Sequence, residues 1–143
     1  MMTFQGGPKE AARMLALLDV ESRRRILGEL EIKDPRTAEV VRTLMVTLED
    51  LQFLTIRMLQ EFLKAVSLRE LGLALRRSSP ELKRHLLSQL SLRMQEEIQE
   101  VLQGPPQPKI IAEDAEKKVL KILLEKVEKG EIVLSKDGKD QMV

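Results

Sequence analysis

The sequence predicts an all-α protein built of two subdomains. Apolar residues recur at helical spacing along most of the 143 residues, and the alternating pattern of a half-buried strand is nearly absent. Ser67, Ser79 and Ser91 follow one another at intervals of twelve residues, and each stands directly before a helical pattern. Short helices joined by such brief caps pack as a superhelical stack, in which each helix buries one face against its neighbours.

Three helices are predicted within residues 8–44, after a start at 1–7 that we expect to be flexible. Pro8 suits a first helical position, Asp19 is expected to cap the second helix, and Asp34-Pro35 repeats this signature before the third. Their apolar residues are Ala11, Leu15, Leu18, Ile26, Leu27, Leu30, Val40, Val41 and Leu44.

A break in the helical rhythm follows at 45–48, with the sequence MVTL. It contains β-branched and bulky residues and has no capping chemistry of its own, so we expect a connector there. The second subdomain is expected at 49–134. Its predicted helical segments are 48–54, 55–66, 67–77, 79–90, 91–103 and 111–129.

The last predicted helix is set apart by prolines and ended by a glycine. The GPPQP segment at 104–108 stops the series because tandem prolines cannot continue a helix. Gly130 is the expected C-terminal stop. Beyond it, 131–134 is predicted to be a short extended end, and 135–143 a loose tail.

The composition argues against several classes of function. The 24 basic and 23 acidic residues almost cancel, and Trp and Tyr are absent, so neither a phosphate-binding excess nor a base-stacking platform is indicated. The chain has no cysteine, and no apolar run approaches membrane-spanning length. His85 is the only histidine, and no glycine-rich phosphate loop occurs. We therefore expect no enzyme activity, no cofactor, no metal and no nucleic-acid partner.

The segment 91–103, SLRMQEEIQEVLQ, has a charged side and an apolar side. At roughly 100° per residue, Arg93, Glu96, Glu97 and Glu100 fall on one face of a helix, opposite an apolar side. The charged face is either a solvated surface, with Arg93 and Glu97 as an ordinary i,i+4 pair, or a surface that contacts a partner.

The order of segments resembles the C-terminal domain of the FliG family of flagellar motor switch proteins. The resemblance extends from Gly6 to Leu134 and rests on GGPKEAARMLALLD, RILGELEIKDPRTAEVVRTLM, EDL, LRELGLALRR, SPELKRHLLSQLS and GEIVL. It implies an armadillo-like helical subdomain, joined by a short connector to a six-helix superhelical subdomain. The connector consists of Met45, Val46, Thr47 and Leu48. Val46 and Leu48 stand where the family has aromatic residues.

The resemblance also implies a charged ridge that meets the cytoplasmic loop of the stator. Family cations correspond to Arg76 and Arg93, and the first member of an acidic pair corresponds to Glu100, whereas the second falls on Val101. A later family arginine corresponds to Lys109, beyond the proline loop. The ridge expected here comprises Arg76, Arg93, Glu96, Glu97, Glu100 and Lys109.

A second expected surface is apolar and lies on the armadillo-like subdomain. In the family this part stacks against another armadillo-like helical domain, often of a neighbouring rotor subunit. We expect an uncovered face at Leu15, Leu18, Ile26 and Leu30. The expected partners are therefore the stator loop and other switch-complex proteins or rotor subunits, with a possible homo-oligomer. The expected location is cytoplasmic, peripheral to the inner membrane at the flagellar basal body.

Two alternatives remain open from the sequence. The superhelical architecture is also similar to the cytoplasmic domain of a family of magnesium transporters, in which Glu96, Glu97 and Glu100 would belong to an ion-sensing site. The other alternative is a helical-repeat scaffold with no role in motility. The chain is either an excised domain or a naturally short relative.

Overall fold

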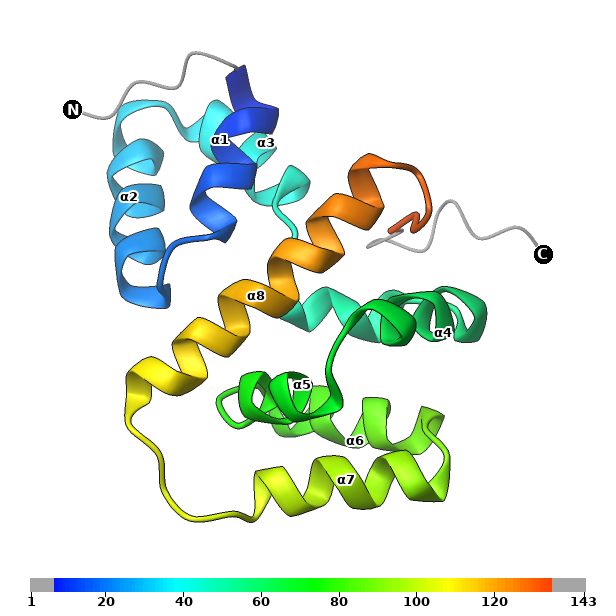
Figure 1. Cartoon of the computed structure of the whole chain (residues 1–143). Coiled ribbons are helices and arrows are strands. Elements are labelled where there is room, and N and C mark those ends of the chain that lie inside the picture. Colours follow the sequence, from blue (N-terminus) through cyan, green and yellow to red (C-terminus); the bar gives the residue numbers. More distant parts are fainter. Residues whose placement is uncertain (1–6, 135–143) are drawn as a thin grey trace. The chain divides into compact units, whose positions relative to one another are not determined.

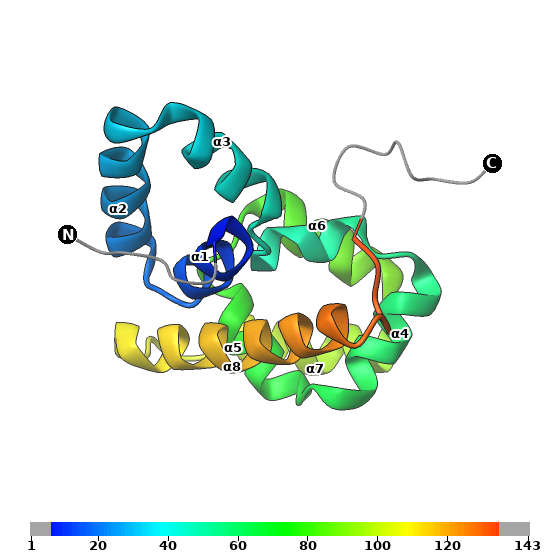
Figure 2. The same ribbon diagram turned by 90° about the horizontal axis from the view of Figure 1, so that it is seen from above.

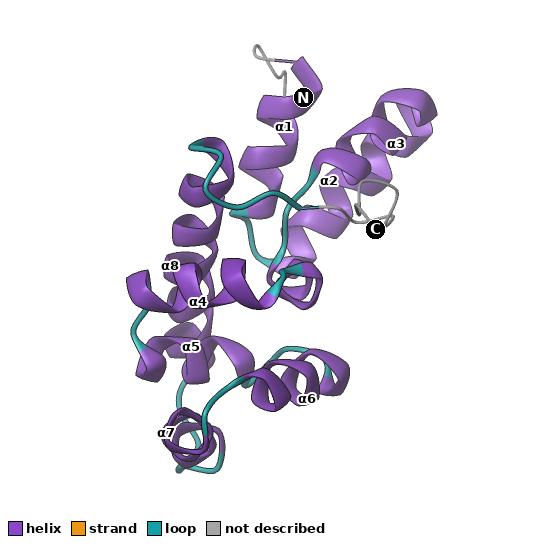
Figure 3. Cartoon of the chain, turned by 90° about the vertical axis from the view of Figure 1, so that its right-hand side faces the viewer, coloured by secondary structure: helices purple, strands orange, loops and turns teal. Residues whose placement is uncertain are grey.

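The computed structural model describes residues 7–134, apart from the side chain of Val20. The chain divides into two compact units, of which the first ends at Thr47 and the second begins at Leu48. All regular elements of the described residues are helices (Figure 3). The prediction of an all-α fold is confirmed. The expected flexible start at 1–6 and the tail at 135–143 lie outside the described residues.

The first unit contains three helices, α1 (Gly7–Ala16), α2 (Val20–Lys33) and α3 (Pro35–Leu44), which are blue to cyan in Figures 1 and 2. Both predicted caps form. An oxygen of the Asp19 carboxylate accepts from the backbone N–H of Ser22 at 3.3 Å, and Asp34 accepts from that of Thr37 at 3.2 Å. Asp34 also closes α2, since its own N–H donates to the Leu30 carbonyl. One residue therefore separates α2 from α3.

A small hydrophobic core holds the three helices of the first unit together. Its buried members are Ala11, Ala12, Leu15, Leu27 and Val41, against which Leu18, Ile26, Leu30 and Met45 pack half-buried. The expectation that Leu15 lies on an uncovered face is wrong, because this side chain is fully buried in the core.

Two further details of the first unit differ from the prediction. The first helix ends at Ala16 rather than near Leu18, which lies in the following turn. Of the three apolar residues named for the third helix, Val41 is buried, whereas Val40 and Leu44 are 41% and 45% exposed. Ala38 is buried as well and was not named. A small alanine at helical spacing from a valine forms the inner face of α3.

The second unit contains one 3₁₀ helix and five α-helices among residues 48–134. They are η1 (Leu48–Phe53), α4 (Ile56–Ala65), α5 (Leu68–Leu75), α6 (Pro80–Gln89), α7 (Leu92–Leu102) and α8 (Lys109–Glu128). The predicted segment at 48–54 is a 3₁₀ helix, the form that short pieces often take. Leu48, expected in the connector, is its first residue, and α8 begins two residues earlier than expected.

Hydroxyl caps start four successive helices of the second unit. The side-chain oxygens of Thr55, Ser67, Ser79 and Ser91 accept hydrogen bonds from the backbone N–H three residues later, at 3.2–3.3 Å. These bonds satisfy N–H groups that no helical carbonyl reaches. Thr55, Ser67 and Ser91 each follow the preceding helix after one residue, so these helices are joined almost without a loop. Leu90 closes α6 and Ser91 opens α7.

Helix α5 lies between α7 and α8 and packs against both (Figures 1 and 3). Five successive residues of α5, 71–75, are buried. Ion pairs cross to α8 from both ends of α5: Glu70 lies 3.5 Å from the Lys118 ammonium, and the Arg77 guanidinium lies 3.7 Å from Glu113. The two helices run antiparallel, because the earlier residue on α5 meets the later residue on α8. Helix α5 is thus the central element of this unit.

The end of α8 folds back on its own last turn. Gly130 adopts a φ of 77°, the left-handed conformation that glycine accepts at a helix end. The N–H groups of Glu131 and Ile132 then donate to the Lys126 carbonyl at 2.9 and 3.2 Å. Ile132 is buried. The predicted extended end at 131–134 does not begin at Glu131, because Glu131 and Ile132 are tied to α8, and the four residues form no strand.

Candidate interaction ridge on helix α7

Four of the six predicted ridge residues lie together on α7. Arg93, Glu96, Glu97 and Glu100 are all exposed and share one face of this helix. Ile98, on the other side, is fully buried. The Arg93 guanidinium lies 3.6 Å from the Glu97 carboxylate, and the Arg93 side chain is 89% exposed. The charged face of α7 is therefore solvated and accessible to a partner, and its one ion pair among the described residues is weak.

Arg76 occupies a different kind of position. It is the C-cap of α5, and its half-buried side chain reaches across to the end of α7. Its Nε and Nη2 donate to the Val101 carbonyl at 3.0 and 2.6 Å, and its Nη1 donates to the Pro105 carbonyl at 3.0 Å. The guanidinium is engaged with the backbone beside the ridge, whereas the ridge side chains of α7 extend into solvent.

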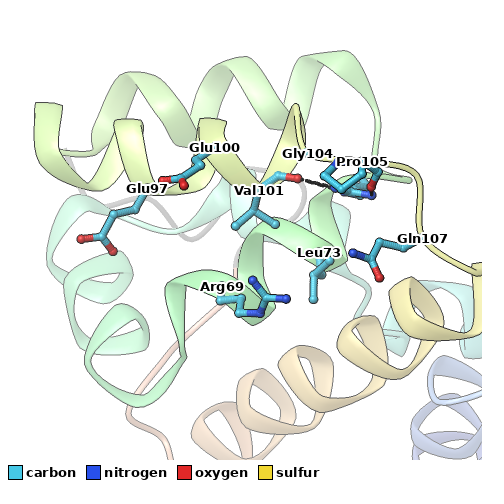
Figure 4. Close-up of a pocket in the computed structure, with 9 residues that line it drawn as sticks. Arg69, Leu73, Glu97, Glu100, Val101, Gly104, Pro105 and Gln107 are labelled. Atoms are coloured by element: carbon cyan, nitrogen blue, oxygen red, sulfur yellow. Dashed lines mark hydrogen bonds between the residues drawn. The ribbon is translucent and has the colours of Figure 1, made fainter.

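A groove of about 400 Å³ runs between α5 and α7 (Figure 4). Leu73, Val101 and Pro105 supply apolar surface, and charged groups line the same groove. Figure 4 shows Glu97 and Glu100 on α7, and Arg69 on α5. The complete lining is Arg69, Leu73, Arg76, Glu97, Glu100, Val101, Gly104, Pro105 and Gln107.

Sequence reasoning missed Arg69 as a neighbour of the ridge. It lies seven residues before Arg76, which places both side chains on one side of α5, two turns apart. This spacing was available in the sequence. Gly104, Pro105 and Gln107 line the groove because the loop at 104–108 passes beside α5. No local sequence pattern indicates this path.

Lys109 is separated from the other predicted ridge residues by the proline loop. It is exposed and is the first residue of α8. Among the described residues, no hydrogen bond or ion pair joins it to α7. The structure therefore brings Glu97, Glu100 and Arg76 together around one groove and leaves Arg93, Glu96 and Lys109 outside its lining.

The predicted connector residues have different environments. Met45 closes α3 and packs against the core of the first unit. Val46 and Thr47 are half-buried, and Leu48 has already entered η1. The non-helical stretch is thus limited to three residues.

The predicted stacking face is only partly available. With Leu15 in the core, Leu18, Ile26 and Leu30 remain half-buried at the surface of the first unit. Ile32, on α2, is 86% exposed and was not predicted as part of this surface. A search for large apolar residues outside the buried stripe of α2 would have found it.

The described residues lack two features that other functions would require. None of the helices in residues 7–134 has both the length and the apolar character needed to cross a membrane. Over the same residues, no three acidic or histidine side chains gather closely enough to hold a metal ion. Glu96, Glu97 and Glu100 share a helix face without forming such a group, so no observation favours the magnesium-sensing alternative.

Comparison with known proteins reveals similarity along almost the whole chain. The family model described as the FliG C-terminal domain matches residues 28–134. The flagellar motor switch protein FliG of Bacillus subtilis is 32% identical over 143 residues, which is 99% of this chain and 42% of that protein. The FliG of Thermotoga maritima is 31% identical over 140 residues, 96% of this chain and 42% of that protein.

Solved structures show the same relationship. A crystal structure of FliG from Helicobacter pylori superposes with a TM-score of 0.64 at 29% identity, covering 92% of this chain and 62% of that chain. Full-length FliG from Aquifex aeolicus gives a TM-score of 0.56 at 30% identity, over 91% of this chain and 40% of that one. The chain thus spans about two fifths of the length of the relatives named above. From the matched residues and the shared helical architecture, we conclude that this chain belongs to the FliG family and corresponds to its C-terminal domain.

Proposed function

We propose that this chain is a rotor and switch component of the bacterial flagellar motor, and that it contacts the stator through the charged face of α7. Membership of the FliG family supports the assignment to the motor. The observation that carries the stator contact is the position of Arg93, Glu96, Glu97 and Glu100. These four ionised side chains are exposed on one face of a helix whose other face is anchored in the unit.

Exposed charges suit a contact that forms and breaks repeatedly. Charge complementarity at the rim of an interface raises the rate of association and fixes register, while adding little to the lifetime of the complex. The Arg93–Glu97 pair is 3.6 Å apart and largely solvated, so exchanging it for a pair with a partner costs little. The expected stator segment is a cytoplasmic loop with complementary charges, and the force passes through ion pairs without any bond chemistry.

Charge reversal tests this assignment. We expect Glu97→Lys and Glu100→Lys, alone and together, to impair stator binding and swimming, and a reversed charge on the stator loop to restore part of both. We expect Arg93→Glu to impair stator binding and swimming as well, and a basic residue placed on the stator loop to restore part of both. Glu125→Lys on α8 is the matched control, since it reverses an exposed carboxylate away from the ridge. Normal swimming and rotation direction with all three ridge charges reversed would rule out the stator contact.

The first unit supplies the proposed contact with neighbouring rotor subunits. Leu18, Ile26 and Leu30 lie half-buried beside the core, and they offer apolar surface to another armadillo-like helical pair. Ile26→Asp should weaken this association in sedimentation experiments without unfolding the unit. This contact would be contradicted if the chain stayed monomeric at high concentration and did not bind other switch-complex proteins. The proposed location is the cytoplasmic face of the inner membrane, at the basal body.

A further inference from the structure

We propose that Arg76 is a positioning residue, which ties the end of α7 and the following proline loop to α5. Arg76 was expected to be a ridge cation that meets the partner directly. In the structure its guanidinium donates to backbone carbonyls. Arg76 therefore affects the stator contact indirectly, through the position of α7. That functional part rests on the proposed function, whereas the structural part stands on the contacts of Arg76 itself.

The three hydrogen bonds of Arg76 connect segments far apart in the sequence. The Val101 carbonyl lies 25 residues away and accepts from Nε and Nη2, while the Pro105 carbonyl lies 29 residues away and accepts from Nη1. Val101 belongs to the last turn of α7, and its carbonyl also accepts from the backbone N–H of Gly104 at 3.3 Å, so Arg76 adds its bonds to a helix end that already has one backbone donor. A cation at this end of a helix also interacts favourably with the helix dipole. One side chain therefore caps α7 and holds the next loop.

The loop itself has few other means of attachment. Three of the four residues in 105–108 are prolines, which have no backbone N–H to donate. Pro108 precedes α8 without a side-chain cap. The loop must therefore be held mainly through its carbonyls, and Arg76 donates to one of them.

Gly104 provides the space that this arrangement needs. A Cβ atom at position 104 would lie 3.0 Å from Nη2 of Arg76 and 3.4 Å from the Val101 carbonyl oxygen. Any side chain there would press on the guanidinium and on its acceptor. The absence of a side chain at 104 and the arginine at 76 thus fit one another.

Lysine separates this role from that of a simple charge. It keeps the positive charge of Arg76, but its single ammonium cannot reproduce the planar set of donors that reaches two carbonyls. If Arg76 acted only as a ridge cation, Arg76→Lys would preserve function. If Arg76 positions α7, Arg76→Lys should impair function nearly as much as Arg76→Gln.

The first experiment is amide hydrogen exchange of the whole chain. For Arg76→Lys and Arg76→Gln we expect exchange at Gln103 and Gly104, whose N–H groups donate to the Gln99 and Val101 carbonyls, to become at least tenfold faster, with the circular dichroism of the helices retained. Arg69→Lys is the matched control, since Arg69 is the other arginine of the groove and makes none of the hydrogen bonds that Arg76 makes to the Val101 and Pro105 carbonyls. Unchanged exchange in both Arg76 variants would overturn the proposal.

A second experiment uses Gly104→Ala, which alters the site without touching the charge. We expect this substitution to accelerate exchange in the last turn of α7 more in the presence of Arg76 than in an Arg76→Gln background. Equal effects in the two backgrounds would show that residue 104 and Arg76 do not share a contact, contrary to the proposal.

Swimming distinguishes the positioning role from the proposed function. With the positioning role, Arg76→Lys reduces swimming towards the level of Arg76→Gln. Where the α7 charge reversals impair swimming, full swimming with Arg76→Lys overturns the positioning role. If charge reversals on α7 leave swimming intact while Arg76→Lys accelerates exchange, the stator assignment fails and the structural role of Arg76 stands.

Discussion

Gly72 of α5 and Val101 of α7 lie so close that a Cβ atom on Gly72 would stand 2.8 Å from the Cβ of Val101. Real Cβ atoms are not found at this distance, so the two helices approach here because residue 72 has no side chain. By the resemblance to FliG, the second member of the family's acidic pair corresponds to Val101. The valine instead packs against α5, next to the carbonyl that Arg76 holds. The contacts around Val101 thus determine both the distance between α5 and α7 and the position of the end of α7.

Gly72→Ala is therefore expected to destabilise the second unit by about 1–3 kcal/mol, the usual cost of overpacking a helix contact. Val101→Ala in the same chain should recover only a small part of this loss, because it removes the two methyl groups at 2.9 and 3.5 Å but keeps the Cβ at 2.8 Å. Gly28→Ala on α2 is the control. A Cβ atom there meets nothing within 4 Å, so we expect a gain of about 0.5–1 kcal/mol. Urea denaturation measures all three, and a neutral Gly72→Ala would contradict the close approach.

A second prediction concerns the start of α6. The Glu49 carboxylate accepts from the backbone N–H of Ser79 at 3.0 Å and from its hydroxyl at 2.7 Å. The hydroxyl oxygen in turn accepts from the N–H of Leu82. We expect Glu49→Ala to lower the free energy of unfolding by about 1–2 kcal/mol, since charge-assisted hydrogen bonds are lost. Ser79→Ala should remove part of the same network. Additive losses in the double variant, measured by denaturation, would show that the two residues act independently.

The ion pair between Arg77 and Glu113 gives a third prediction. Their charged groups are 3.7 Å apart, with side chains 31% and 20% exposed. A double-mutant cycle with Arg77→Gln and Glu113→Gln should yield a coupling of about 0.3–1 kcal/mol. The Arg93–Glu97 pair is the matched comparison, because it has a similar distance but is far more exposed. Its coupling should be smaller, and a larger value would contradict the role of solvent screening.

Asp34 leads us to expect an acid-dependent loss of stability in the first unit. Hydrogen bonds from the Thr37 hydroxyl and N–H lower the pKa of the Asp34 carboxyl from its ordinary value. A folded-state pKa below the unfolded one means that this stabilisation is present above the unfolded pKa. It is lost as the pH falls through the folded pKa, below about pH 4.

Asp34→Asn should therefore flatten this part of the stability profile. The difference in denaturation midpoint between wild type and variant is expected to be largest near neutral pH and to shrink as the pH falls. Asp114→Asn on α8 controls for the loss of one negative charge. A constant difference from pH 7 to the acid limit would contradict the assignment.

The helices could be predicted from the sequence because their signals are local. Asp19, Asp34, Ser67, Ser79 and Ser91 act as caps over three residues, and each prediction is confirmed by a hydrogen bond. The charged face of α7 also follows from helical spacing alone. In these cases the residues that decide the structure stand next to one another.

The misassignments came from contacts between distant segments. The residues near Arg76 in the sequence do not predict that its guanidinium donates to the carbonyls of Val101 and Pro105. Leu15 was placed on an outer surface because apolar periodicity marks one side of a helix without saying what covers it. The likeness to a family supplied the order of the segments, but the side-chain partners of this chain required its own structure.

The joints between helices have a mechanical consequence. Val66 and Ser67 alone separate α4 from α5, and Leu90 and Ser91 alone separate α6 from α7. Such joints have no slack to take up when one helix is loaded. A push delivered to α7 therefore passes directly to α6 through a two-residue joint, whereas along the chain towards α8 it must pass through the longer segment 103–108.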